Sequence, residues 1–158
     1  MSKERILILD EEANTQWTLK EWLESEDFLV IPVNSIKQAL ESLRETDFGG
    51  LITEYRVDQT TTLDVIGEFK KSFPEAYVMM LSHGEVQEGE YEKIINSGTD
   101  DFFYKPIALK KVLLHLEKGL NHRRELLLKN EFEEELKKLN WNASNCEEGT
   151  TSNRHPIT

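Results

Sequence analysis

The chain has 158 residues and a formal net charge of -11, with 30 acidic against 19 basic residues. This length has room for one domain with a full hydrophobic core plus an appendage. The acidic balance argues against a nucleic-acid-binding surface, which needs clustered Lys and Arg to replace the counterions of the phosphates. A single cysteine, Cys146, excludes an internal disulfide and any Cys/His zinc set, and it fits a cytoplasmic protein.

The N-terminal residues 1–5 run directly into the apolar strand expected at 6–9. A signal peptide would place a longer apolar stretch there. The chain also has no stretch approaching the roughly 20 apolar residues of a membrane span. We therefore expect neither a leader nor a membrane-spanning segment.

Short apolar runs then alternate with segments of helical periodicity. In the helix expected from Ser35 the apolar positions recur at i, i+3, i+4 and i+7, which is one stripe of an amphipathic helix. The expected strands are 6–9, 28–33, 51–52, 77–81 and 101–104, and the expected helices are 14–24, 35 onward, 63–72, 90–96 and 108 onward.

Near-continuous apolar strands separated by helices indicate a parallel sheet that is covered on both faces. The predicted fold is therefore α/β, with a doubly wound five-stranded sheet. In such folds ligands bind at the carboxyl ends of the strands. Candidate functional residues should follow the apolar runs directly.

The helical pattern that begins at Ala108 continues to Leu139. A helix of about 30 residues is about 45 Å long, so its distal half cannot pack on so small a domain. Glu and Lys alternate around its apolar positions, as on the flank of a coiled coil, although a solvated helix that frays is the alternative. We expect a domain at 1–120, a helical extension and possible coiled coil at 121–140, and a disordered tail at 141–158.

Polar residues follow four of the five predicted strands. Asp10 and Glu11 follow the first, Glu54 the third, Ser82 the fourth and Lys105 the fifth. Each alone is weak evidence, because an acidic pair after a strand is often a helix-start signal. Together they supply carboxylates suited to Mg²⁺, a positive charge and a hydroxyl donor. That set is typical of phosphoryl transfer to a carboxylate.

Because of these polar residues and their places after the strands, residues 4 to about 120 resemble a response-regulator receiver domain, the phosphoacceptor module of two-component signalling. The motifs that carry the resemblance are Ile6–Glu12, Leu51–Arg56, Val78–Ser82 and Asp101–Pro106.

The resemblance implies a flavodoxin-like sheet with strand order 2-1-3-4-5. It also places Glu54 at the phosphoacceptor position, where the family carries Asp, and it implies Mg²⁺ as a candidate cofactor. By the same resemblance the metal ligands are Asp10, Glu11, Glu54 and the backbone carbonyl of Arg56. The switch residues are Ser82 and Phe102. The phosphate-binding residues include Lys105, which precedes a cis bond to Pro106.

Two departures from the family pattern lie on the phosphorylation side of this pocket. Glu54 carries one more methylene than Asp, which moves its carboxylate by roughly 1.5 Å. Because about 1 Å of misplacement can cost on the order of 100-fold in rate, efficient phosphorylation is not expected. The following loop, 56–63, lacks the proline and glycine that usually shape this turn in the family.

Glu54 then has two interpretations. Its longer carboxylate contacts Lys105 or Ser82 and partly imitates a phosphoaspartate, or it forms a plain ion pair with Lys105 that fills a vacant pocket. Replacement acceptors at Asp58 or Asp64 are disfavoured, because both residues fall in the loop or at the next helix start.

The leading hypothesis is a phosphorylation-independent receiver, not an enzyme, in phosphorelay signalling. It would act by homodimerisation or partner binding, through the face of the fourth helix, fifth strand and fifth helix or along the C-terminal helix. A sensor histidine kinase or an effector protein is the expected partner, with no direct contact to nucleic acid or membrane. The alternatives are a conventional receiver that takes phosphate from a histidine kinase, and a structural adaptor with an idle pocket.

Overall fold

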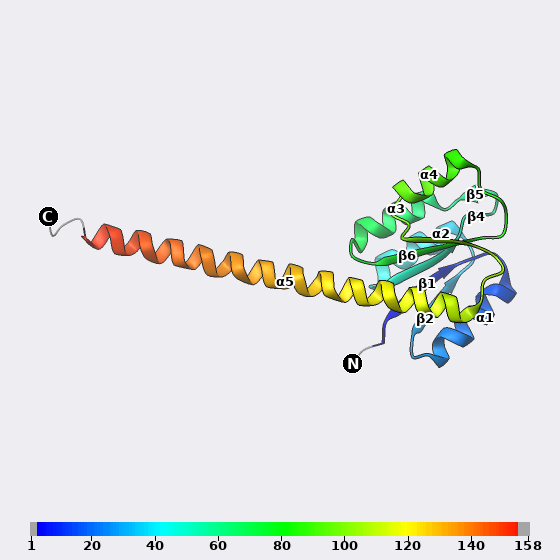
Figure 1. Ribbon diagram of the computed structural model, residues 1–158, viewed down its shortest axis with the longest axis horizontal. Coiled ribbons are helices and arrows are strands. Elements are labelled where there is room, and N and C mark those ends of the chain that lie inside the picture. Colours follow the sequence, from blue (N-terminus) through cyan, green and yellow to red (C-terminus); the bar gives the residue numbers. More distant parts are fainter. Residues whose placement is uncertain (1–2, 155–158) are drawn as a thin grey trace. The chain divides into compact units, whose positions relative to one another are not determined.

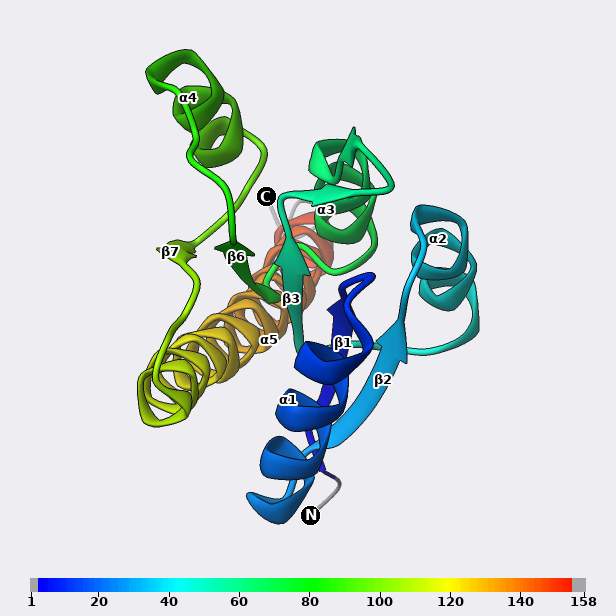
Figure 2. The ribbon, with the colours of Figure 1, turned by 90° about the vertical axis from the view of Figure 1, so that its right-hand side faces the viewer.

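A computed structural model describes residues 3–154, and side chains up to residue 145. Its main sheet has five parallel strands in the order β2-β1-β3-β6-β7, which Figure 2 shows from one end. This order confirms the doubly wound fold predicted from the sequence. The strands are β1 (Arg5–Leu9), β2 (Leu29–Val33), β3 (Gly50–Glu54), β6 (Tyr77–Ser82) and β7 (Asp101–Tyr104).

Helices cover both faces of the sheet, with α1 and α5 on one side and α2 and α3 on the other (Figure 2). Double coverage explains why the strands are apolar without alternation. Ser35 caps α2, since its hydroxyl accepts a hydrogen bond from Gln38 N at 3.1 Å. The helices are α1 (Ala13–Ser25), α2 (Ile36–Glu45), α3 (Leu63–Ser72), α4 (Glu88–Asn96) and α5 (Leu109–Arg154).

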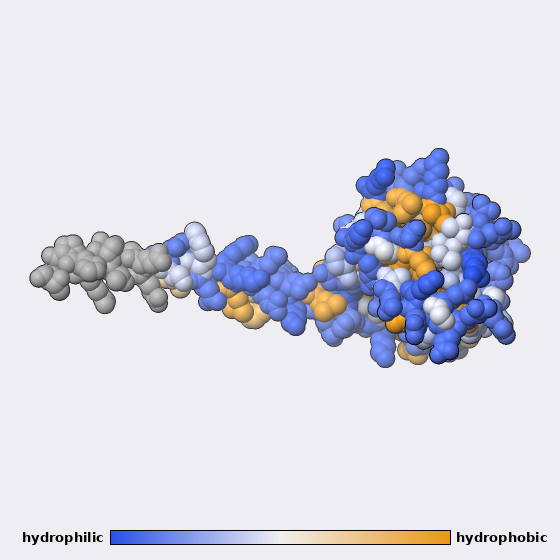
Figure 3. All heavy atoms as spheres, turned by 90° about the horizontal axis from the view of Figure 1, so that it is seen from above, coloured by the Kyte–Doolittle hydropathy of each residue, from blue (hydrophilic) through white to orange (hydrophobic). Residues whose placement is uncertain are grey.

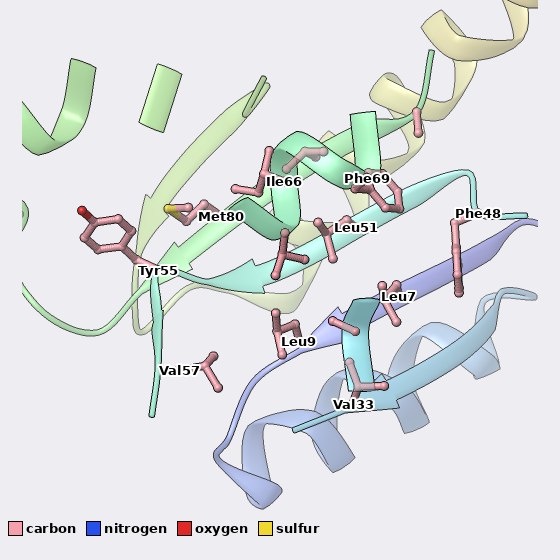
Figure 4. Close-up of a cluster of buried hydrophobic side chains, with 14 of the residues drawn as sticks. Leu7, Leu9, Val33, Phe48, Leu51, Tyr55, Val57, Ile66, Phe69 and Met80 are labelled. Atoms are coloured by element: carbon pink, nitrogen blue, oxygen red, sulfur yellow. The ribbon is translucent and has the colours of Figure 1, made fainter. Parts of the chain in front are cut away.

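Successive residues of a strand point to opposite faces, so the sheet divides its core in two. Leu7 and Leu9 enter the cluster under α2 and α3, which Figure 4 shows with Leu51, Ile66 and Phe69. Their neighbours in β1 enter a second cluster with α1 and α5. Burial of each such side chain contributes about 1.5–3 kcal/mol, which makes these clusters the main source of stability.

The beginning of α5 packs closely against β6 and β7. Gly119 faces the ring of Tyr77, and a Cβ at this position would overlap that ring. The Tyr77 hydroxyl donates to Asp101 Oδ2 at 2.5 Å, and His115 Nδ1 lies 3.5 Å from the same oxygen. Burial, together with the Asp101 hydrogen bond and charge, raises the pKa of Tyr77, so the phenol remains a donor.

A short antiparallel hairpin, β4 (Arg56–Val57) and β5 (Thr60–Thr61), follows β3. The sequence analysis did not anticipate it. Its turn residues Asp58 and Gln59 have φ angles of 52° and 64°, which match the left-handed pair of a type I′ turn. Val57 anchors the hairpin in the core.

Figure 1 shows α5 as one uninterrupted helix from Leu109 to Arg154. The first compact unit ends at Arg123, and residues from 124 form a second unit. The sequence predicts disorder from residue 141, whereas residues 141–154 are helical. The segment 141–154 contains no proline, and its Asn and Ser residues carry only a modest helical penalty. Residues 155–158 lie outside the described part.

Within the described residues, no helix is long and apolar enough to span a membrane.

Candidate functional site

A buried ion-pair cluster lies at the carboxyl ends of β1, β3 and β7. The Nζ atom of Lys105 is 2.6 Å from Asp10 Oδ2 and 2.7 Å from Glu54 Oε2. Asp10 and Glu54 are 5% and 3% exposed. The sequence predicts that these residues meet at one sheet edge, and the structure brings them together. The Lys105–Pro106 bond is cis, as the resemblance implied.

The ammonium of Lys105 stays charged in this environment. Burial alone would lower its pKa, but the close contacts of the ammonium with the negatively charged carboxylates of Asp10 and Glu54 outweigh burial and raise the pKa of Lys105. The cluster is therefore a permanent cation held between two carboxylates at neutral pH.

His83 holds the other oxygen of Glu54. Glu54 Oε1 accepts a hydrogen bond from His83 N at 3.3 Å and lies 3.1 Å from His83 Nδ1. Glu54 Oε2 accepts no well-directed hydrogen bond within the described residues, so its 2.7 Å contact with Lys105 is chiefly ionic. The His83 side chain is 69% exposed at the entrance of the pocket. His83 was not among the residues predicted from the sequence, although it directly follows Ser82 at a strand end.

The two predicted switch residues are engaged elsewhere. The Ser82 hydroxyl donates to Gly84 O at 2.8 Å and makes no hydrogen bond to Glu54. Phe102 is half-buried, and its ring meets Tyr91 and Tyr104 edge-on at centroid distances of 5.8 and 5.1 Å. The side chains of both residues thus find partners outside the carboxylate cluster, while the backbone carbonyl of Ser82 accepts a hydrogen bond from Lys105 N at 2.8 Å.

The hairpin contacts the acidic residue that follows Asp10. Asp58 N, in the turn, donates to Glu11 Oε2 at 3.0 Å. Arg56 pairs with Glu90 of α4 at 2.9 Å and so ties the hairpin to that helix. Asp64 lies in the first turn of α3, which is the helix-start position expected for it.

The predicted metal ligands do not form a metal site in this arrangement. A cavity of about 210 Å³ is lined by Glu11, Glu54 and Arg56, together with Ser82. Yet no three acidic, His or Cys side chains of the described residues are grouped to hold a metal ion. The ammonium of Lys105 already lies between two of the carboxylates, and Asp58 N binds the third. The residues therefore do not fit Mg²⁺ as they stand.

A larger groove of about 500 Å³ lies beside this cluster, between α1 and the segment that follows β7. Its floor is apolar, with Leu19 and Ile107, and its rim is polar, with Asn14 and Thr18. Lys105 and His83 also line it, so an occupant of this groove would contact the residues that hold Glu54.

Comparison with known proteins gives a consistent result. The family model of the response regulator receiver domain matches residues 6–117. The transcriptional regulatory protein SrrA of Staphylococcus aureus is 26% identical over 117 residues, which are 74% of this chain and 47% of SrrA. ResD of Bacillus subtilis is 22% identical over 113 residues, or 72% of this chain and 46% of ResD. The chain thus spans about half the length of these regulators.

Among solved structures, a CheY-like receiver domain protein from Methanospirillum hungatei superimposes with a TM-score of 0.74 at 18% identity. The match covers 78% of this chain and 98% of that protein. At this identity the likeness bears on the fold alone.

Proposed function

Because the chain belongs to the response regulator receiver domain family of two-component signalling, we propose that it is an atypical receiver that works without phosphorylation at Glu54. It is a cytoplasmic signalling module and not an enzyme. Its output is homodimerisation or the binding of a partner protein, either a sensor histidine kinase or an effector.

The observation that carries this proposal is the state of Glu54. An acceptor carboxylate must be free to attack phosphorus, but both oxygens of Glu54 contact other groups of the chain, Lys105 on one side and His83 on the other. The residue is also almost fully buried. Attack would require Glu54 to leave both partners, and its extra methylene misplaces it further.

The contacts favour a fixed ion pair over imitation of a phosphoaspartate. Imitation would draw the Ser82 hydroxyl toward the carboxylate, since a phosphoryl group offers several acceptor oxygens. Ser82 donates instead to Gly84 O. The ion pairs of the pocket therefore serve to hold the carboxyl ends of the strands together.

A surface suited to self-association lies on α4, β7 and α5. Its exposed apolar residues are Tyr91 and Ile95 of α4, Tyr104 of β7 and Leu114 of α5, which together we call the α4–β7–α5 face. Half-buried Phe102 supports two of these rings from below. Rigid aromatic residues with polar surroundings are typical anchors of protein interfaces.

The charges around this face are self-complementary. On one side, α4 carries Glu88 and Glu92, while Glu90 pairs with Arg56, and on the other side α5 carries Lys110 and Lys111. A twofold axis through the face would place the acidic helix of one copy beside the basic helix of the next. This pattern favours a symmetric dimer.

The second unit offers a further surface. Leu128, Phe132, Leu136 and Leu139 are exposed at spacings of four, four and three, which places them on one side of α5. Figure 3 shows hydrophobic surface on one side of the extended part of this helix. A stripe of this kind is typical of a helix that pairs with another helix. We expect it to strengthen a dimer that forms through the α4–β7–α5 face.

Light scattering of the wild type and of a chain ending at Arg123 tests the proposal. We expect a dimer for the full chain, a weaker dimer for the shortened chain, and the same result with or without a small phosphodonor. A monomer at high concentration for both chains would contradict the dimer.

A conventional receiver remains the second candidate, because the groove beside the pocket would bring a docked kinase next to Lys105 and His83. Incorporation of phosphate into the wild-type chain would favour it.

A further inference from the structure

The two acidic residues after β1 each have an internal partner. Asp10 Oδ1 accepts a hydrogen bond from Glu12 N at 2.9 Å, and Asp10 Oδ2 lies 2.6 Å from the Nζ atom of Lys105. Glu11 Oε2 accepts from Asp58 N in the hairpin turn. The hairpin thus holds one oxygen of Glu11.

Glu54 is held in the same manner. His83 contacts Oε1 through its backbone N and its ring, and the Lys105 ammonium contacts Oε2. Mg²⁺ requires oxygens at about 2.0–2.1 Å in near-octahedral geometry. To reach Asp10 and Glu54 it would have to displace an ammonium that already lies within 2.7 Å of both.

We infer that Lys105 is the resident cation of this pocket, in the place between Asp10 and Glu54 that a divalent metal would otherwise fill, and that the chain neither requires nor recruits Mg²⁺. The inference rests on the proposed function only in treating Glu54 as a fixed residue. The arrangement of the pocket is then set by folding alone and not by an ion or a phosphodonor.

The electrostatics of the cluster support this role. Two buried carboxylates close together repel each other unless a cation lies between them. The ammonium meets that need, and the N–H groups of Glu12 and His83 bind the remaining oxygens. Removal of the ammonium should therefore create a demand for another cation at the same place.

Thermal unfolding of the full wild-type chain gives the first test. The midpoint is measured in EDTA and in about 10 mM MgCl₂, with NaCl added to match ionic strength. A site with a dissociation constant of about 1 mM would raise the midpoint by about 5 °C. We expect no rise, and a rise of that size in the wild type would overturn the inference.

Lys105→Met gives the second test. We expect a lower midpoint than that of the wild type in EDTA and a rise of several degrees when Mg²⁺ is added, because Asp10 and Glu54 then lack their cation. The matched control is Lys70→Met, which removes the ion pair with Asp100 outside the pocket, and its midpoint should not respond to Mg²⁺. Failure of Mg²⁺ to stabilise Lys105→Met, either as purified or during refolding, would overturn the inference.

The two proposals fail separately. A wild-type chain that is stabilised by Mg²⁺ but takes up no phosphoryl group contradicts the resident cation alone. A wild-type chain that is phosphorylated contradicts the proposed function.

Discussion

The pocket and the α4–β7–α5 face belong to the same compact unit. The charged groups of the pocket have partners within the chain, whereas the apolar side chains of the face are exposed. In the pocket, the charges of Asp10, Glu54 and Lys105 are buried, and Lys105 pairs with both carboxylates. On the face, aromatic rings such as Tyr91 and Tyr104 are about half exposed. A satisfied interior has little left to offer a ligand, whereas an exposed aromatic strip gains from burial. This difference supports our proposal that the surface, and not the pocket, carries the output.

Lys105→Met should have the largest effect on stability, because it leaves two carboxylates without their cation. Removing one partner of a buried ion pair costs about 3–5 kcal/mol, so we expect the free energy of unfolding to fall by about 3 kcal/mol in metal-free buffer. Urea denaturation measures this. Lys70→Met removes an ion pair with Asp100 and a hydrogen bond to Ala76 O outside the pocket, and it should cost about 1–2 kcal/mol. Equal losses for the two variants would contradict a special role for the pocket.

High pH should remove the same stabilisation in the wild type. The pKa of Lys105 is raised above its ordinary 10.5, so its contribution is complete below about that pH and is lost as the pH rises through the folded-state pKa. The difference in unfolding free energy between the wild type and Lys105→Met should stay constant from about pH 7 to 10 and shrink above it. A difference that shrinks below about pH 9 would contradict the raised pKa.

Tyr104→Ala tests the α4–β7–α5 face. We expect the dissociation constant of the dimer to rise about tenfold or more, because exposed aromatic anchors dominate interfaces. The unfolding free energy should fall by only about 1 kcal/mol, the value of its ring contact with Phe102. Analytical ultracentrifugation measures the first quantity. Leu29→Ala, an exposed apolar residue on the opposite edge strand β2, is the control and should leave the dimer unchanged.

Gln59→Gly should have the smallest effect and the opposite sign. A non-glycine residue in the left-handed region costs about 1–2 kcal/mol, and Gln59 has a φ of 64°. We expect stabilisation of about 1 kcal/mol by chemical denaturation with no change in the dimer. Destabilisation would show that the Gln59 side chain supports the hairpin.

The fold could be predicted because its strands and helices are long enough to show periodicity. The third helix was expected at 63–72 and is observed at Leu63–Ser72. The hairpin at 56–61 escaped prediction, because strands of two residues show no period and Asp58-Gln59 is not a usual type I′ pair.

The sequence indicates which strand-end residues lie close together, but it does not indicate most of the contacts that they make. Asp10, Glu54 and Lys105 end parallel strands and so had to meet. The contact of His83 with Glu54 and that of Glu11 with Asp58 N depend on loop geometry, and no sequence period reports loop geometry. Periodicity along α5 likewise cannot distinguish buried Leu116 from exposed Phe132.

The most direct test of the account is the intact mass of the wild-type chain after incubation with a small phosphodonor and Mg²⁺, with Glu54→Asp and an ordinary aspartyl receiver treated in parallel. We expect the mass of the wild type to stay unchanged while the ordinary receiver gains a phosphoryl group. Glu54→Asp should gain one, because its shorter carboxylate withdraws from Lys105 and His83. A phosphoryl group on the wild-type chain would contradict the central claim that this receiver works without phosphorylation.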